Sequence, residues 1–496
     1  MNWLEFSNHS TVSLAELPVL SVSQLRHSIM MRCREQGWRP MAFFGCRRDD
    51  GVRLFAILAD DDHAALHAAA ADFFAGEYEY ESLTPQLPGF GSFERELFEQ
   101  TGIKPAGHPW LKPLRFPRDA ASGKKKTDYR FWTLAGESVH EVAVGPVHAG
   151  VIEPGHFRFM CTGEEVRHLE IQLGYQHRGI EKMLRQGDIR TKAVLVEKIA
   201  GDSCIANGMA FAGVLETAAG VKVSPRVQAI RTLALELERI ALHLSTLSGL
   251  ATDIAYLPGS TFFGATRTYV INSLLALCGS RFGFGLIRPG RVNYDLMPEL
   301  VAEWRRTLTM VLDRTVTMGE SMFNQPSVLS RLEQTGVLNA ADAAAIGMLG
   351  VTGRASGVRR DVRADHPFSY FKISPIVKIT LAGGDVFARG FLRYLEARRS
   401  LQYVLTLLDA LPEGGLATAV PAPAPNSLTV AAVEGPRGEI CHTMLTGPYG
   451  ECRWYKLQDP SLINWYGLAL AVRTEGISDF PICNKSFDLS YCGHDL

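Results

Sequence analysis

The sequence is poor in closely spaced cysteines. Nine cysteines are scattered along 496 residues, and no two of them form a CxxC pair. A disulfide framework pairs its thiols and a zinc ribbon spaces them by two residues, so this odd and scattered set argues against both. The sequence also has no GxGxxG motif after a strand, so we expect any NAD chemistry to belong to another chain.

Charge of one sign and long apolar runs are also lacking. The formal net charge is -1, whereas nucleic-acid binding needs a concentrated basic face, so we expect no nucleic-acid partner. The most apolar window, Thr268 to Ile287, contains Arg281 and falls short of the ~18 to 20 uninterrupted apolar residues of a membrane span. The N-terminus has neither the basic start nor the apolar run of a signal peptide. We therefore expect a protein that stays on the cytoplasmic side.

What the sequence does have is the composition of an ordinary globular chain. Hydrophobic residues make up 46% and charged residues 21%, enough for two or three cores. Residues 1–118 are predicted to form a small α/β domain, with two β-like runs in 41–60 around a charged turn at 49–51 and a helical run over 61–76. Residues 119–137 are small, polar and basic, and are predicted to be a linker.

Residues 138–496 are predicted to form a second, mainly helical domain with peripheral β-hairpins. Alternating apolar and polar residues with a turn signal at Gly163 predict the hairpins. From 180 to 410 long helices are predicted, one of them starting after the N-cap Ser224. Strand character returns over 433–459, after a proline-rich loop. The predicted fold class is therefore α+β.

Charged and polar side chains gather in four short blocks rich in small residues. Because buried charge is tolerated only when paired or hydrated, such blocks predict a polar cavity between helices. Surface turns and salt bridges are an equally compatible alternative. Glu238, Arg239 and His243 lie at helical spacing, and we expect ion pairs that fix helix packing there. The candidate site residues are His148, Glu153 and His156 in the first block, Arg178 and Glu181 in the second, Asp202 in the third, and Arg354 and Asp361 in the fourth.

The order of motifs along the chain resembles that of a known family. GPVHAG, HRGIEK, ELERIALHL, GRASGVRRDVR, GGDVFAR and EGPRGE resemble motifs of the large catalytic subunit of formate hydrogenlyase and related membrane-bound group 4 nickel-iron hydrogenases. They also resemble the homologous quinone-pocket subunit of respiratory complex I. FERELFEQTGI and GHPWLKPL resemble the small α/β subunit of complex I, fused here to the large one. The resemblance implies a small α/β domain followed by a hydrogenase large-subunit-like domain.

The same resemblance bears on metal binding, because that family holds nickel and iron on four thiolates from two CxxC motifs. At the matching positions this sequence has Ala200, Ser203, Ser490 and Gly493. Cys204 and Cys492 each lie one residue away, which turns a helical side chain by about 100°. The chain stops three residues after Gly493, without the extension that maturation proteases remove. We expect no nickel-iron centre, and a tail, 479–496, whose strand or loop is kept for packing.

Without the metal, the resemblance points to the quinone pocket of complex I. His148, Glu153, His156, Asp202, Arg354 and Asp361 would supply hydrogen bonds and protons, with Glu153 in the place of the hydrogenase proton-relay glutamate. Arg178 and Glu181 match the RGxE motif that helps hydrogenases bind magnesium, but the terminal partner is missing, so no metal is expected. The complex I tyrosine that meets the quinone falls near Gly201, which has no hydroxyl.

The resemblance also implies partners and a location. The expected partners are an iron-sulfur small subunit, which carries the clusters, and antiporter-like membrane subunits. The chain would then be a peripheral subunit on the cytoplasmic side of the membrane, in a complex I-like oxidoreductase. The only cofactor considered for the chain itself is a quinone. The alternative is a non-catalytic subunit that couples its partners structurally.

Overall fold

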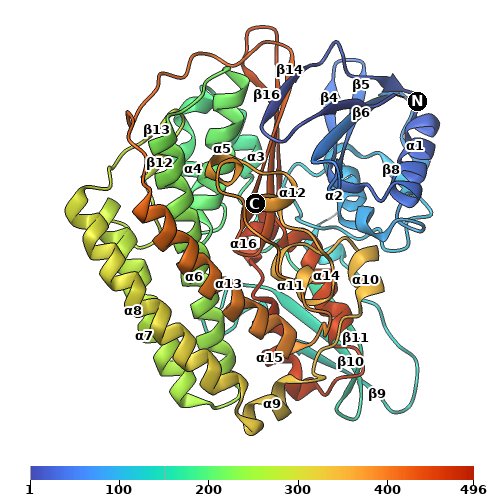
Figure 1. Cartoon of the computed structure of the whole chain (residues 1–496). Helices are drawn as coiled ribbons and strands as arrows, with labels where there is room; N and C mark the ends of the chain where they lie inside the picture. The colour runs from blue at the N-terminus through green and yellow to red at the C-terminus, as the bar shows by residue number, and fades with distance from the viewer. Residues whose placement is uncertain (1, 124, 151) are drawn as a thin grey trace.

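The first part of the chain forms a five-stranded sheet with two helices beside it (Figure 1). In the computed structural model, which describes residues 2–123, 125–150 and 152–496, the strand order is β1-β6-β5-β4, and β3 pairs in parallel with β6. The turn at 49–51 and its two flanking strands are confirmed. The elements are β1 (Leu4–Phe6), β3 (Val19–Leu20), α1 (Val22–Glu35), β4 (Arg39–Arg48), β5 (Gly51–Asp60), β6 (Ala65–Phe74) and α2 (Gly91–Thr101).

The helix predicted over 61–76 is wrong, because these residues contain strand β6. β6 pairs along its whole length with β5, and its first half pairs with β1 on the other side. Its run of alanines favours a helix in isolation. The same small side chains also fit a strand buried on both faces between two neighbours, and this sheet pairing decides the structure.

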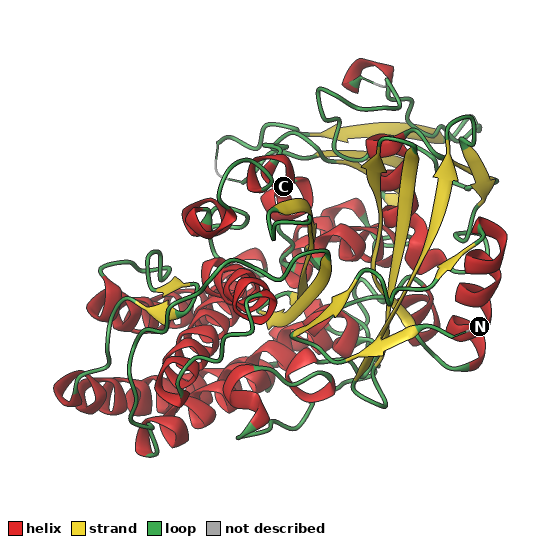
Figure 2. Ribbon diagram, turned by 90° about the horizontal axis from the view of Figure 1, so that it is seen from above, coloured by secondary structure: helices red, strands yellow, loops and turns green. Residues whose placement is uncertain are grey.

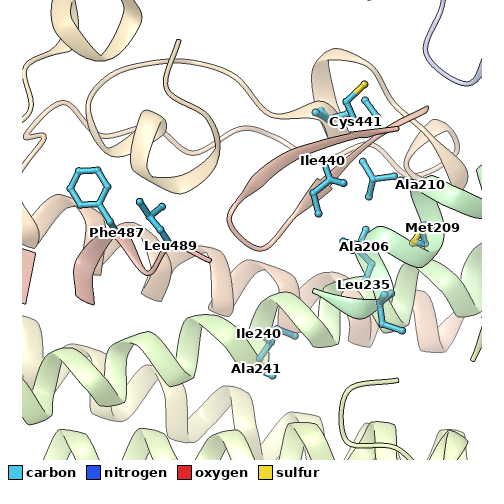
Figure 3. Packing of buried hydrophobic residues seen from close by; sticks show 14 of the residues in the cluster. Ala206, Met209, Ala210, Leu235, Ile240, Ala241, Ile440, Cys441, Phe487 and Leu489 are labelled. Atoms are coloured by element: carbon cyan, nitrogen blue, oxygen red, sulfur yellow. The ribbon is translucent and has the colours of Figure 1, made fainter. Parts of the chain in front are cut away.

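A second sheet joins the two ends of the sequence. Its antiparallel order is β16-β15-β14-β2, so β2 (Ser10–Ser13) completes a sheet formed by β14 (Ser427–Gly435), β15 (Gly438–Thr446) and β16 (Cys452–Gln458). The strand character predicted over 433–459 is confirmed. Helix α5 (Cys204–Ala218) covers the sheet, and in Figure 3 Ile440 of β15 lies next to Ala206 and Ala210 of α5.

Long helices make up the other side of the molecule, and the strands gather opposite them (Figure 2). α6 starts as predicted: the Ser224 hydroxyl accepts a hydrogen bond from the Val227 N–H, and Pro225 is the first helical residue. The bundle consists of α6 (Pro225–Asp253), α7 (Leu257–Cys278), α8 (Pro298–Phe323) and α13 (Val386–Asp409). The shorter elements are β7 (Glu79–Glu81), β8 (Lys104–Ala106), α3 (Ile180–Leu184), α4 (Ala193–Val196), β12 (Ile287–Arg288), β13 (Arg291–Val292), α9 (Pro326–Leu332), α10 (Ala340–Ala345), α11 (Gly350–Ala355) and α12 (Val362–Asp365).

A small antiparallel sheet and a helical tail complete the fold. β9 (Val139–Val144), β10 (His156–Thr162) and β11 (Glu165–Gln172) form the predicted hairpins, with the turn at Gly163. The tail is helical rather than the predicted strand or loop, and consists of α14 (Ser461–Ala471), α15 (Phe480–Phe487) and α16 (Tyr491–Asp495). α16 ends at the centre of the molecule (Figure 1), where Leu496 is buried. The α+β class is thus confirmed.

Buried ion pairs hold the N-terminal sheet against the rest of the chain. The Arg39 guanidinium donates to both carboxylate oxygens of Glu439, at 3.0 and 2.6 Å, and to Asp61 at 2.8 Å. Arg39 and Glu439 are 5% and 2% exposed, so these charges depend on each other. Across the described residues, no helix combines the length and the apolar composition that spanning a membrane requires.

Replacing Arg39 by Met should destabilise the fold by about 3 kcal/mol or more, because two buried carboxylates lose their cation. The measurement is the thermal unfolding midpoint of the purified chain. Arg190→Met removes an exposed ion pair with Asp188 and should change the stability by less than about 1 kcal/mol. Equal effects of the two substitutions would contradict the role given to Arg39.

Candidate functional site

The site centres on Arg437, in the turn between β14 and β15. Its guanidinium donates to both carboxylate oxygens of Asp202, at 2.8 and 2.7 Å, and to the Ser203 hydroxyl at 3.2 Å. It also donates to the main-chain oxygen of Asp488 at 2.5 Å. Asp488 lies between α15 and α16, so one side chain joins the loop before α5 to the tail.

The four positions that the resemblance assigns to metal ligands are buried and satisfied by other contacts. Ser203 accepts from Arg437, and the Ser490 hydroxyl accepts the Gly493 N–H at 2.9 Å, which caps α16. Ala200 has only a methyl group. Beside Gly493 lies the Asp459 carboxylate, and a Cβ at position 493 would come within 2.6 Å of its Oδ2. These positions therefore supply no thiolate.

The two neighbouring cysteines are protonated at neutral pH. Burial, followed by the charge of Glu238, raises the pKa of the Cys204 thiol. Burial, followed by Glu153, raises the pKa of Cys492 to about 12. Among the described residues, no three His, Cys, Asp or Glu side chains come together as a metal site.

Glu153 and Arg178 meet at the tail, on the main chain of Cys492. Glu153 accepts the Cys492 N–H at 3.2 Å, and Arg178 donates to the Cys492 carbonyl at 3.0 Å. Arg178 also donates to the carbonyl of Ile199 at 3.0 Å. The two predicted site residues thus connect the hairpin region, the segment before α5 and the tail.

His148 and His156 shape the loop that carries Glu153. A ring nitrogen of His148 bonds with the Gly155 carbonyl at 2.9 Å, and one of His156 with the Gly145 carbonyl at 3.2 Å. Burial lowers the pKa of His156, so its ring is neutral at pH 7. Neither imidazole contacts Asp202 or Arg437.

Arg354 and Asp361 lie in a separate buried cluster, which we call the arginine-carboxylate network. Arg354 donates to Glu396 at 2.7 Å and to Glu434 at 2.8 Å, and Asp361 accepts from Arg363 at 2.7 Å. Glu434 belongs to the same β14–β15 turn region as Arg437, so the network adjoins the site. Its members are Arg239, Arg354, Arg363, Glu236, Asp361, Glu396 and Glu434.

The charges in this network do not balance. It contains three arginines and four carboxylates, and burial lowers the pKa of the adjoining His243 to about 4, so His243 adds no cation at pH 7. Burial, followed by the charge of Asp361, raises the pKa of Glu434 to about 7. One carboxyl group of the network can therefore hold a proton near neutral pH.

Glu238 is a functional candidate that sequence analysis missed. The expected ion pairs form at Arg239 and His243, with Glu236 and Glu396. Glu238 instead accepts the main-chain N–H groups of Ile205 and Ala206, at 2.7 and 3.1 Å, at the start of α5. Burial nevertheless raises its pKa to about 8. No local sequence signal indicates this, because its partners lie on another helix.

Glu238 and Asp202 line a narrow cavity of about 20 Å³, together with Arg267. That volume holds about one water molecule. Arg267 has a buried Nε without a partner among the described residues. The arrangement suits a protonatable carboxyl group with a water molecule between it and Asp202.

Glu181 lies on the other side of the tail and is already paired. Its carboxylate accepts from the Lys456 ammonium and from the Leu457 N–H, both at 2.9 Å. Lys456 also pairs with Glu96 of α2. A cation at Glu181 would have to displace this ammonium. Arg178 and Glu181 both line a separate cavity of about 690 Å³.

Comparison with known proteins finds two matching families in the chain. Residues 47–129 match the family described as respiratory-chain NADH dehydrogenase, 30 Kd subunit, and residues 253–427 match its 49 Kd subunit. Hydrogenase-4 component G of Escherichia coli is 28% identical over 92% of this chain and 84% of its own length. Formate hydrogenlyase subunit 5 of the same organism is 28% identical over 84% of this chain and 77% of its own.

The fused C/D protein of NADH-quinone oxidoreductase from Phocaeicola vulgatus is 28% identical over 72% of this chain and 76% of its own length. The relatives thus include both hydrogenase components and part of a quinone oxidoreductase. The two family matches follow each other in the order that the motifs predict. The chain is therefore a fusion of 30 kDa-type and 49 kDa-type domains, and belongs to the complex I-like family of hydrogenase and NADH-quinone oxidoreductase subunits.

Proposed function

We propose that this chain is a core subunit, without a nickel-iron centre, of a membrane-associated complex I-like oxidoreductase. The observation that carries the proposal is the Arg437–Asp202 ion pair beside Ser203. A nickel-iron centre needs soft thiolates that bridge two metals. A methyl group, two hydroxyl groups and a glycine stand at the four positions instead, and the hydroxyls already take part in hydrogen bonds.

Proton transfer is the chemistry that the remaining residues support. Glu238 and Glu434 have pKa values raised to about 8 and about 7, so each can give and take a proton near neutral pH. Arg239, which follows Glu238 on α6, donates to the Glu434 carbonyl at 2.5 Å. The two acids thus lie on either side of one buried guanidinium, next to the Arg437 site.

A quinone-type acceptor would meet the chain at the loop that carries His148, Glu153 and His156. Two apolar side chains of this loop are exposed, Val147 at 78% and Ile152 at 50%. Exposed apolar groups beside polar ones suit a partner surface and the ring of a quinone. We propose that an iron-sulfur subunit docks here and supplies the electrons, and that membrane subunits of the antiporter type anchor the complex on the cytoplasmic side.

A second candidate function is structural coupling without redox chemistry. The observation in its favour is the cavity beside Asp202, whose volume of about 20 Å³ is far too small for a quinone headgroup. In this case the arginine-carboxylate network would transmit a change of charge or shape between partner subunits. The two functions differ in whether quinone reduction depends on Glu153.

Glu153→Gln should lower quinone-dependent electron transfer by the purified complex about 100-fold, because it removes a proton donor. The complex should contain no stoichiometric nickel by elemental analysis. Glu164→Gln makes the same change on an exposed turn and should leave the rate unchanged. Full activity of Glu153→Gln would favour the coupling function, and one nickel per chain would refute the proposal.

Gly493→Ala should destabilise the chain by about 1 to 3 kcal/mol, since the new Cβ meets the Asp459 carboxylate at 2.6 Å. Gly208→Ala on α5 meets only Ile287, at 3.6 Å, and should be neutral or slightly stabilising. Thermal unfolding measures both. A smaller cost of Gly493→Ala in an Asp459→Ala background would confirm the contact, and an equal cost would contradict it.

Glu238→Gln should change how stability depends on pH. The folded chain keeps the Glu238 proton up to about pH 8, whereas the unfolded chain releases it near the ordinary value of 4.5. The wild type should therefore lose stability relative to Glu238→Gln as the pH rises from 5 to about 8, by up to about 5 kcal/mol. Unfolding midpoints across this range measure the difference. The exposed Glu333→Gln is the control, and a pH-independent difference for Glu238→Gln would contradict the raised pKa.

A further inference from the structure

A cavity of about 690 Å³ lies where the N-terminal sheet meets α3, β16 and Leu496. Arg47 on β4 and Arg118 beyond α2 form one wall, and Arg178 and Arg185 around α3 form the other. The volume is in the range of small-molecule sites. The cavity is separate from the Arg437 site and takes no part in the proposed function.

Basic groups outnumber acidic groups around this cavity. The acids are Glu99, Asp119, Glu181 and the carboxylate of Leu496, and the first three are already engaged. Glu99 accepts three main-chain N–H groups, Asp119 pairs with Lys182, and Glu181 pairs with Lys456. The basic groups are Arg47, Arg115, Arg118, Arg178, Lys182 and Arg185.

Three of the arginines have no carboxylate partner within the described residues. Arg118 is exposed and forms no ion pair or side-chain hydrogen bond there. Arg47 donates to the Gln100 carbonyl at 3.0 Å, and the Arg185 guanidinium lies 4.1 Å from the ring centroid of Trp454. Their charges are not neutralised, so the cavity is electropositive and attracts anions.

Arg115 adds a buried donor that lacks an acceptor. Its side chain is 2% exposed, and its other nitrogens bond with the His494 carbonyl and with Glu96. Its Nη2 has no partner in the described part of the chain. A buried N–H without an acceptor costs about 1 to 3 kcal/mol, so a ligand oxygen in the cavity would relieve this cost.

We propose that this cavity binds a phosphate-class polyanion, either pyrophosphate or the phosphate groups of a nucleotide. Guanidinium groups donate two parallel hydrogen bonds to phosphate oxygens, and several of them in one concave site favour a polyvalent ligand. The arginines come from both sides of the junction between the N-terminal sheet and α3. The bound anion therefore holds these two parts of the chain together.

The test is isothermal titration of the full chain with inorganic pyrophosphate and with ATP. We expect one site for each, mutual competition, and weaker binding as NaCl is raised. Arg118→Glu should weaken the binding at least tenfold. Arg34→Glu makes the same charge change on an exposed part of α1, outside the cavity, and should leave the affinity within twofold.

Several outcomes would overturn the proposal. One is no binding of either anion, and another is equal weakening by Arg118→Glu and Arg34→Glu. A third is tight binding of a polyglutamate peptide that pyrophosphate does not displace, which would mark an acidic protein segment as the ligand. The unfolding midpoint without ligand should be the same for both variants. If Arg118→Glu fails to fold, Arg47→Glu replaces it, and normal affinity of that variant overturns the proposal equally.

Discussion

Buried charge has to be paired, and in this molecule that requirement falls on the turn between β14 and β15. Arg437 extends from the turn to Asp202 and to the carbonyl of Asp488, while Glu434 on the same turn binds Arg354. Segments far apart in the sequence are thereby held by one short hairpin. The relatives named as hydrogenase components share this chain's ancestry, yet here the corresponding interior is held by ion pairs and hydrogen bonds.

The same requirement explains why protonatable groups lie at the centre of the molecule. Four carboxylates among three arginines leave one negative charge without a counterpart, and a proton is the simplest compensation. Glu238 is placed differently, facing the main-chain N–H groups of α5 with no cation bonded to it. An interior with surplus acids can change its charge in response to a neighbouring reaction without unfolding.

Local patterns predicted the elements whose structure depends on local interactions. The Ser224 cap and the periodicity of α6 indicated where that helix begins, because both act within a few residues. β6 was mistaken for a helix because its strand pairing with β1 and β5 is not visible in its own alanines. Motif order located Glu153, Asp202 and Glu181, but not their partners. Glu181 meets Lys456 from 275 positions away, and only the folded chain brings these two together.

The pairing of β2 with β14 has a consequence for how the protein is made. Thr11 and Thr429 share a hydrogen bond although 418 positions separate them. During synthesis the edge of β2 must therefore wait, unpaired, until nearly the whole polypeptide has left the ribosome. Such long-range pairing slows folding and exposes a strand edge to other chains meanwhile. Cells that produce this protein thus have a reason to shield its first residues with a chaperone until the last strands arrive.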